Sequence, residues 1–235
     1  MSLEKYNIVH KKVVSSTMDE VKNYVNNTLL FADMQTAGRG KGDRVWVSEE
    51  NLNLYMSLVI NATEPDINYS NFSFLSSVCV VESLNNFTEN LNVQTKWPND
   101  VLINQKKVSG ILLEFDLNKG ILVIGIGVNL FSYPENAMFT ATSVKNEGFS
   151  IERMKFINFF LERFDYYLND LKNNGFKKIH DAWLKNSYNY KKKIIVKNDK
   201  YDNISGVFEE FDLNGTLFLK EEGGNIMKIV SGDIF

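Results

Sequence analysis

Short apolar runs separated by polar segments dominate the first 130 residues, and this pattern predicts β-strands. The runs with the length of single strands are residues 6–14, 29–34, 53–60, 93–97 and 119–130. Residues 101–115 contain two further runs around the polar pair Asn104–Gln105, which predicts a hairpin. We expect Pro98 to end the strand before it, because proline has no backbone N–H to donate.

Helical spacing appears in other parts of the chain. Apolar side chains recur every three or four residues over 71–90 and 150–171, and a shorter helix is expected over 175–186. The polar stretch 15–25 predicts one more helix, with Thr17 as the N-cap and a glutamate three positions later completing a capping box. Strands interleaved with helices in this way indicate an α/β (or α+β) domain.

The pattern changes near residue 190, where short strands follow one another without helices. These runs are residues 192–198, 203–211, 215–222 and 225–231. A turn is expected at Leu213–Asn214–Gly215. Strands at this spacing predict a small β-barrel. We therefore divide the chain into an α/β domain over residues 1–187 and a β-barrel over residues 188–235.

Composition narrows the class of protein. Hydrophobic residues make up 44% of the 235, which is enough for a packed core, and the net charge of −3 argues against a protein built mainly to bind nucleic acid. A single cysteine excludes an intrachain disulfide. The N-terminus lacks the apolar segment of a signal peptide, and the longest apolar run, 121–128, is too short to cross a bilayer. We expect a soluble, cytoplasmic protein without membrane contact.

Half of the arginines lie in one glycine-rich segment, Gln35–Trp46, with the sequence QTAGRGKGDRVW. Glycines allow backbone conformations that point successive N–H groups at an anion, and Arg39 and Arg44 add fixed positive charge. The segment matches neither GxxxxGK[ST] nor GxGxxG, so the standard nucleotide fingerprints fail. It predicts an anion-binding loop. The alternative is a flexible, solvated turn.

A second candidate site lies in residues 95–114, TKWPNDVLINQKKVSGILLE. The polar and small side chains that make it a candidate are Lys96, Asn99, Asp100, Lys107, Ser109 and Gly110. Small residues next to a lysine let a flat ligand approach the backbone. The alternative is a hairpin with exposed lysines. Taken alone, GIGVN at 125–129 fits a closely packed strand, and SST at 15–17 fits a helix cap.

The sequence gives little support for a metal site or for catalysis by histidine or cysteine. His10 and His180 are the only histidines and lie far apart in the sequence, which argues against a zinc site or a histidine-based triad. Cys79 lies in the apolar run FLSSVCVV with no basic residue nearby, so we expect it to be an inert part of the core.

Taken in order, these segments resemble the biotin protein ligases. The motifs that carry the resemblance are SST at 15–17, QTAGRGKGDRVW at 35–46, KWPND at 96–100, KKVSGILLE at 106–114, GIGVN at 125–129 and ATSV at 141–144. The last strands resemble that family's C-terminal barrel. The resemblance implies a class II aminoacyl-tRNA-synthetase-like core, which is a mixed sheet with flanking helices, followed by an SH3-like barrel. Because SST begins at residue 15, it implies a monofunctional type without a DNA-binding domain.

The function that the resemblance implies is ATP-dependent biotinylation. Enzymes of this family join biotin to ATP as biotinyl-5′-AMP and then transfer the biotinyl group to one lysine of a carrier domain. The implied carrier is the biotin carboxyl carrier domain of acetyl-CoA carboxylase or a related carboxylase. The implied small ligands are biotin, ATP and Mg²⁺, with the metal held mainly by the phosphates. We expect no DNA binding and allow for a homodimer.

The resemblance also assigns roles to residues. The expected catalytic residues are Lys107, Asp100 and Arg39. The expected biotin-binding residues are Ser16, Thr17, Met18, Gln35, Gly38, Arg39, Gly40, Lys41, Lys107 and Gly110. The expected nucleotide-binding residues are Arg39, Arg44, Trp46, Lys96, Asn99, Lys107 and Asn129, with Phe139 as a candidate ring for stacking on adenine. The metal ligands are left open. Lys107 is expected to contact the biotin carboxylate and the α-phosphate, and Asp100 to accept a proton from the incoming lysine.

Three positions depart from the pattern that is common in the biotin protein ligases. Met18 stands where asparagine is common, Lys41 where arginine is usual, and Asp43 where glycine is usual, so closure of the loop over the adenylate is in question. Two other functions are alternatives to biotinylation. A lipoate or octanoate acyltransferase shares the α/β core. It would need a usable cysteine or its own glycine-rich RRxxGGG segment. The other alternative is a non-catalytic biotin-binding regulator.

Overall fold

Two β-sheets organise the computed structural model, which describes residues 3–64, 67–135, 139–198, 201–230 and 232–234. The larger sheet has the strand order β1-β2-β3-β7-β6-β5-β4. Its strands are β1 (Asn7–Val14), β2 (Thr28–Gln35), β3 (Leu54–Asn61), β4 (Val93–Lys96), β5 (Asp100–Ile103), β6 (Lys106–Asp116) and β7 (Ile121–Val128). Only β1 and β2 pair in parallel, and the other neighbours are antiparallel. The mixed sheet expected from the sequence is therefore confirmed.

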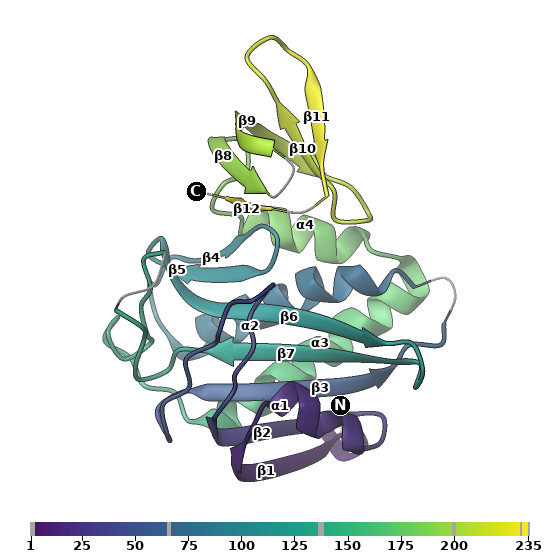
Figure 1. The fold of residues 1–235 in the computed structure, drawn as a ribbon, viewed down its shortest axis with the longest axis vertical. Helices are drawn as coiled ribbons and strands as arrows, with labels where there is room; N and C mark the ends of the chain where they lie inside the picture. Colours follow the sequence, from purple (N-terminus) through teal and green to yellow (C-terminus); the bar gives the residue numbers. More distant parts are fainter. Residues whose placement is uncertain (1–2, 65–66, 136–138, 199–200, 231, 235) are drawn as a thin grey trace.

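The helices lie mostly on one side of this sheet. They are α1 (Thr17–Glu20), α2 (Phe72–Phe87), α3 (Arg153–Asn174) and α4 (Lys177–Lys185), with short 3-10 turns η1 (Leu3–Lys5), η2 (Val21–Asn23) and η3 (Tyr69–Asn71). Figure 1 shows α2 and α3 behind the sheet and α1 in front of it. No helix in the described part of the chain combines the length and apolarity needed to cross a membrane.

Alternation along the strands explains this arrangement, because successive side chains of a strand point to opposite faces of the sheet. On β7, Ile124 and Ile126 join the large apolar cluster that also contains Phe72 of α2 and Phe160 of α3. Burying each such side chain contributes about 1.5–3 kcal/mol, so this face supplies most of the stability. The residues that alternate with them, Val123, Gly125 and Gly127, belong to the opposite face, which we call the open face.

The second sheet follows α4 and has the order β11-β10-β9-β8-β12. Its strands are β8 (Lys193–Asn198), β9 (Tyr201–Phe211), β10 (Leu217–Lys220), β11 (Ile226–Ile229) and β12 (Asp233–Ile234). The β-module expected after residue 190 is thus present, with one more strand than the sequence suggested. Closure into an SH3-like barrel and the boundary between residues 187 and 188 remain predictions.

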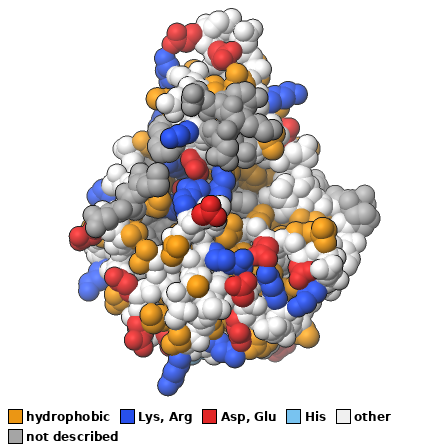
Figure 2. Space-filling model, in the orientation of Figure 1, with side chains coloured by type: hydrophobic (Ala, Val, Ile, Leu, Met, Phe, Trp, Pro, Cys, Tyr) orange, Lys and Arg blue, Asp and Glu red, His pale blue; other side chains and the backbone are white. Residues whose placement is uncertain are grey.

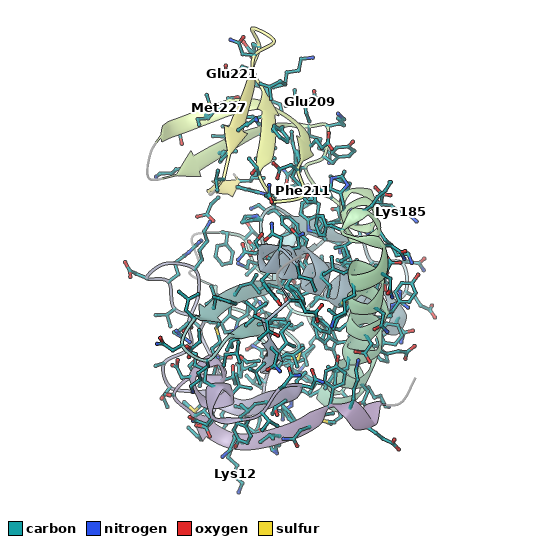
Figure 3. The ribbon with its side chains drawn as sticks, turned by 90° about the vertical axis from the view of Figure 1, so that its right-hand side faces the viewer. Lys12, Lys185, Glu209, Phe211, Glu221 and Met227 are labelled. Carbon is teal, nitrogen blue, oxygen red and sulfur yellow. The ribbon has the colours of Figure 1, made fainter. Side chains whose placement is uncertain are left out.

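Aromatic packing joins the second sheet to the helices. Phe211 of β9 stacks on Phe74 of α2 with ring centroids 4.5 Å apart. The ring centroid of Trp183 in α4 lies 5.1 Å from that of Phe211. The indole N–H of Trp97 donates a hydrogen bond to the carbonyl of Gly215 at 3.1 Å. Phe211 accordingly lies at the junction between the second sheet and the helices in Figure 3. These contacts hold the second sheet against α2, α4 and the segment that follows β4.

The hairpin predicted around Asn104–Gln105 is confirmed. β5 and β6 pair in antiparallel on either side of these two residues, whose φ angles are 49° and 69°. Positive φ at both central positions is the geometry that joins two twisted strands with a two-residue turn. The turn sets Lys107 of β6 opposite Leu102 of β5, and its side chain reaches Asp100 at the start of β5.

The predicted N-cap at Thr17 is wrong by one residue. Ser16 has the extended backbone of a cap, with φ −150°, and its hydroxyl accepts the hydrogen bond from the N–H of Met18. Glu20 pairs with Lys11 instead of closing a capping box, and the α-helix lasts only from Thr17 to Glu20. Two adjacent hydroxyl residues give the same capping signal, and the sequence pattern alone does not separate them.

Candidate active site

Three glycines form a bare floor on the open face of the large sheet. Gly110 of β6 pairs with Gly127 of β7, and Gly125 lies two residues earlier on β7. A Cβ atom on Gly127 would lie 2.2 Å from Cε2 of Trp46, and one on Gly125 would lie 2.6 Å from Sδ of Met18. Side chains larger than hydrogen would therefore push Trp46 and Met18 off the sheet. We call Gly110, Gly125 and Gly127 the glycine floor.

The glycine-rich loop folds back on itself and lays Trp46 on this floor. Arg39 and Val45 form an isolated antiparallel bridge, the N–H of Gly40 donates to the carbonyl of Arg44 at 2.7 Å, and Trp46 donates to Gly38 at 3.0 Å. In Figure 1 the dark purple loop crosses in front of β6 and β7. A Cβ on Gly38 would lie 2.3 Å from the carbonyl oxygen of Trp46, so this turn requires glycine.

Lys107 and Asp100 form an ion pair at one end of the glycine floor. Their charged atoms lie 2.5 Å apart, and their side chains are 13% and 20% exposed. The Lys107 ammonium also lies 4.6 Å from the ring centroid of Phe139 and 5.9 Å from that of Trp46. A cation held among rings and shielded from water stabilises negative charge more strongly than one in solution. This arrangement brings together Lys107 and Asp100, two of the three residues expected to be catalytic.

Lys96 stands close to this pair. Burial lowers the pKa of the Lys96 ammonium, and the neighbouring charge of Lys107 lowers it further, against the opposing effects of Asp100 and Asp233. The outcome is a pKa below the ordinary value for lysine. A second ammonium beside Lys107 concentrates positive charge at the end of the floor where anionic groups would bind.

Two asparagines expected at the nucleotide donate hydrogen bonds to backbone carbonyls in this structure. The Asn99 amide donates to the carbonyl of Ile111 at 2.6 Å, and the Asn129 amide donates to the carbonyl of Thr142 at 3.1 Å. Asn129 is buried. Both amide groups thus fix backbone segments around the site, and their contact with a nucleotide remains a prediction.

A buried polar network closes the other end of the glycine floor. Gln35 accepts hydrogen bonds from the backbone N–H and the hydroxyl of Thr17, at 2.9 and 3.1 Å. The Ser57 hydroxyl donates to Thr17 Oγ1 at 2.8 Å, and Gln35 Nε2 donates to Ser48 at 3.0 Å. Ser57 pairs with Gly125 across the sheet, so the network borders the floor. Its hydroxyls and amide can recognise a small head group that both donates and accepts hydrogen bonds.

Sequence reasoning missed Ser57 and Ser48. Ser57 is the polar residue in the apolar run of β3, and its position opposite a glycine of GIGVN was the available signal. This signal can be recognised only when the pairing of β3 with β7 is known.

The cations of the loop are already paired with carboxylates of the protein. Arg39 lies 2.8 Å from Asp19 and 2.8 Å from Glu114. Burial raises the pKa of Glu114, but its hydrogen bond from Lys22 and the charge of Arg39 outweigh this and lower the pKa below the usual range. Figure 2 shows Lys and Arg side chains gathered with acidic ones on this face below the second sheet. The Arg39 side chain is therefore an anchor of the loop here.

Two loop N–H groups are buried without a hydrogen-bond partner among the described residues. They are Arg39 Nε and Trp46 Nε1. A buried donor without a partner costs about 1–3 kcal/mol, and an acceptor on a bound ligand would offset this cost. Their position on either side of the loop hairpin supports a binding role for the loop.

Histidine and cysteine residues stay outside this site. Cys79 is fully buried in α2, as predicted, and burial raises the pKa of its thiol well above the usual value. His10 lies 2.9 Å from Asp33, and His180 contacts the carbonyl of Phe211. Within the described ranges, no group of three or more His, Cys, Asp or Glu residues is arranged to hold a metal ion.

The whole chain resembles proteins of known family. A family model described as the Biotin/lipoate A/B protein ligase family matches residues 10–130, which include the loop, the Lys107–Asp100 pair and the glycine floor. The chain is 34% identical over 246 residues to the bifunctional ligase/repressor BirA of Bacillus subtilis, covering 97% of this chain and 73% of that protein. The chain belongs to the biotin/lipoate A/B protein ligase family.

Other relatives agree with the biotin-specific branch of that family. The biotin–[acetyl-CoA-carboxylase] ligase of Paracoccus denitrificans is 30% identical, with 83% of this chain and 85% of that protein covered. The solved structure of the biotin protein ligase of Aquifex aeolicus in complex with biotin and ATP superposes with a TM-score of 0.85 at 30% identity, over 97% of both chains. The biotin protein ligase fold and the ligase class of enzyme predicted from the motifs are confirmed.

Proposed function

We propose that this family member activates biotin with ATP as biotinyl-5′-AMP and transfers the biotinyl group to a lysine of a carboxylase carrier domain. The observation that carries the proposal is the glycine floor, with the Lys107–Asp100 pair at one end and the Thr17–Gln35 network at the other. A flat ligand with a polar head and an anionic tail matches such a floor. The relatives named above, one solved with biotin and ATP and one named for acetyl-CoA carboxylase, support the same assignment.

In this proposal biotin lies beside the side chains that rest on the glycine floor, between the Thr17–Gln35 network and the Lys107–Asp100 pair. Its ureido head meets Ser16, Thr17 and Gln35, and its ring packs on Met18 and the strands beside Gly110. Trp46, whose indole lies on Gly110 and Gly127, packs against the side of the ligand, with Gly38 and Gly40 letting the loop approach closely. The biotin carboxylate then points toward Lys107, where Arg39 and Lys41 of the loop add positive charge from further away. Packing of the loop against the ligand also protects a reactive acyl phosphate from water.

The first step joins two anionic groups. A carboxylate oxygen of biotin attacks the α-phosphorus of ATP, and pyrophosphate leaves with the electrons of the broken P–O bond. Lys107 offsets the repulsion between the carboxylate and the phosphate because its ammonium lies where both must meet. Arg44, Lys96, Asn99 and Asn129 surround the nucleotide, with Phe139 as the stacking ring. Magnesium enters with the triphosphate as part of the nucleotide substrate.

The second step needs a neutral amine. The amine nitrogen of the carrier lysine attacks the acyl carbon, AMP leaves, and Asp100 accepts the proton that the nitrogen releases. Asp100 is placed for this role because it is part-buried and its ion pair with Lys107 holds it where the acyl group is expected to lie.

The variant Asp100→Asn tests this second role. It keeps the shape of the side chain and removes its basicity, so we expect transfer of the biotinyl group to fall by about 10²-fold or more, while binding of biotin changes little. Single-turnover transfer from isolated biotinyl-5′-AMP to a carrier domain measures the first quantity, and calorimetric titration with biotin measures the second. Asp181→Asn, which changes an exposed carboxylate on α4, is the control. Equal losses in transfer and biotin binding would refute the assignment.

The decisive experiment for the whole proposal is pyrophosphate exchange. We expect incorporation of labelled pyrophosphate into ATP that depends on biotin and is absent with lipoate or octanoate. Exchange with either of those acids but not with biotin would favour the acyltransferase alternative. Tight binding of biotin without exchange would favour a non-catalytic regulator.

Expectations about other partners accompany the proposal. We expect no shift of operator-like DNA by low nanomolar protein, and sedimentation will decide between a monomer and a homodimer. A cytoplasmic location follows from the same proposal, because carboxylase carriers and ATP are found there.

A further inference from the structure

The tip of the glycine-rich loop is bound to the last strand of the second sheet. Lys41 Nζ donates to the carbonyl of Gly232 at 2.8 Å and lies 3.7 Å from the carboxylate of Asp233. Arg44 donates to the same carboxylate oxygen at 3.3 Å, and its Nε donates to the carbonyl of Lys41 at 3.0 Å. Two cations that the sequence assigned to ligand anions thus share one carboxylate about 190 residues away in the sequence.

Asp233 is well placed for this contact. It belongs to the short edge strand β12, where it pairs with Lys197 of β8, and β12 lies at the side of the second sheet that faces the core in Figure 1. Its negative charge also acts on Lys96 at the end of the glycine floor. One carboxylate therefore stands among three cations, Lys41, Arg44 and Lys96, in the region where the proposed function places the nucleotide phosphates.

The contact is weak enough to be exchanged. The Lys41, Arg44 and Asp233 side chains are 33%, 41% and 42% exposed, so solvent screens their attraction. A phosphate group offers more charge and more acceptor oxygens than a carboxylate and competes well for an arginine and a lysine.

We propose that Asp233 is a positioning residue whose carboxylate holds Lys41 and Arg44 before the nucleotide binds, and that the nucleotide phosphates then displace it. This inference rests on the proposed function for the identity of the displacing anion, but the internal contact is independent of it. In the ligand-free protein, Asp233 keeps the loop tip folded toward β12. When the phosphates arrive, the cations turn to them, and the loop exchanges its contact with the second sheet for one with the ligand.

The first test measures the loop without any ligand. Trypsin cleaves after Lys41 and Arg44 only when the loop tip opens, and in this regime the cleavage rate follows the open population. We expect Asp233→Asn to raise cleavage at these two bonds by about 2–5-fold, the range set by an exposed ion pair, and Asp233→Glu to restore slow cleavage. Glu222→Gln is the matched control, because it breaks an exposed ion pair with Lys193 in the same sheet. Cleavage of Asp233→Asn at the wild-type rate would overturn the proposal.

The second test measures displacement. With its internal competitor removed, Asp233→Asn should lower the KM for ATP in pyrophosphate exchange by about 2–5-fold and change the KM for biotin by less, because Lys41 is expected to act on the biotin carboxylate only from a distance. A higher KM for ATP would overturn displacement. Thermal melting confirms that each variant is folded. The cleavage test requires no turnover, so a protein without biotin-dependent exchange would refute the proposed function while the cleavage rates still decide the role of Asp233.

Discussion

The two faces of the large sheet are made by the same strands and do different work. Ile124 and Gly125 are neighbours on β7, yet Ile124 is buried under α2 and α3, whereas Gly125 leaves room for Met18 on the open face. The covered face is filled by large apolar side chains, and the open face carries the glycine floor, the polar network and the Lys107–Asp100 pair. Because alternate residues of a strand face opposite ways, stability and the candidate site are encoded in adjacent positions.

Substitutions on the two faces of the large sheet should therefore have different effects on activity and on stability. Variants of the open face should lose activity at nearly constant stability, and variants of the covered face should lose stability at nearly constant activity per folded molecule. Each claim about the open face is tested with a control variant that carries the same substitution at a position outside the candidate site.

Lys107→Ala should have the largest effect on the open face. Removing the ammonium takes away the main charge expected to stabilise the reacting oxygens, and we expect biotin-dependent exchange to fall by about 10²–10³-fold, the range for a single such group. The adjacent Lys106→Ala is the control, because Lys106 is 43% exposed and only distantly paired with Glu147. Exchange by Lys107→Ala at a rate close to wild type, with the melting temperature unchanged, would show that the role proposed for Lys107 is wrong.

Gly127→Ala should have the next largest effect. The added methyl group would lie 2.2 Å from Trp46 Cε2, so the indole must leave the floor. Displacement of a group that contacts the ligand by about 1 Å can cost 10²-fold, and we expect a loss of exchange of about 10–10²-fold.

Acrylamide quenching provides a direct readout of this change, because Trp97 and Trp183 are buried and Trp46 is the more accessible indole. Gly223→Ala, where a Cβ meets open space, is the control. Full exchange together with unchanged quenching in Gly127→Ala would mean that Trp46 does not depend on the floor.

Much of this architecture was predictable from local patterns. The strands and helices follow from apolar spacing, and the Asn104–Gln105 hairpin follows from its polar turn. The site elements are brought together by strand pairing, and the motif resemblance supplied that information for Lys107, Asp100 and Gln35. Within single segments the pattern left ambiguities, such as the choice between Ser16 and Thr17 for the N-cap.

The partners of the loop cations were not predictable in this way. No motif or spacing in the sequence marks Asp19, Glu114 and Asp233 as partners of the loop. Only the folded chain shows that Arg39, Lys41 and Arg44 reach these carboxylates. β12 has two residues, which is too short to show a period. An interpretation of the loop as a simple anion cradle was therefore incomplete, because the protein supplies its own anions there.

The smallest predicted effect is that of a substitution on the covered face, which should change stability without changing activity. Ile124→Val removes one methyl group from the fully buried cluster, so we expect a loss of about 0.5–1.5 kcal/mol in the free energy of unfolding. Urea denaturation measures this loss. Exchange per folded molecule should match the wild type, since Ile124 points away from the glycine floor. A fall in exchange as large as that of Gly127→Ala, with stability unchanged, would mean that the two faces of β7 are coupled and that the helices behind the sheet shape the site in front of it.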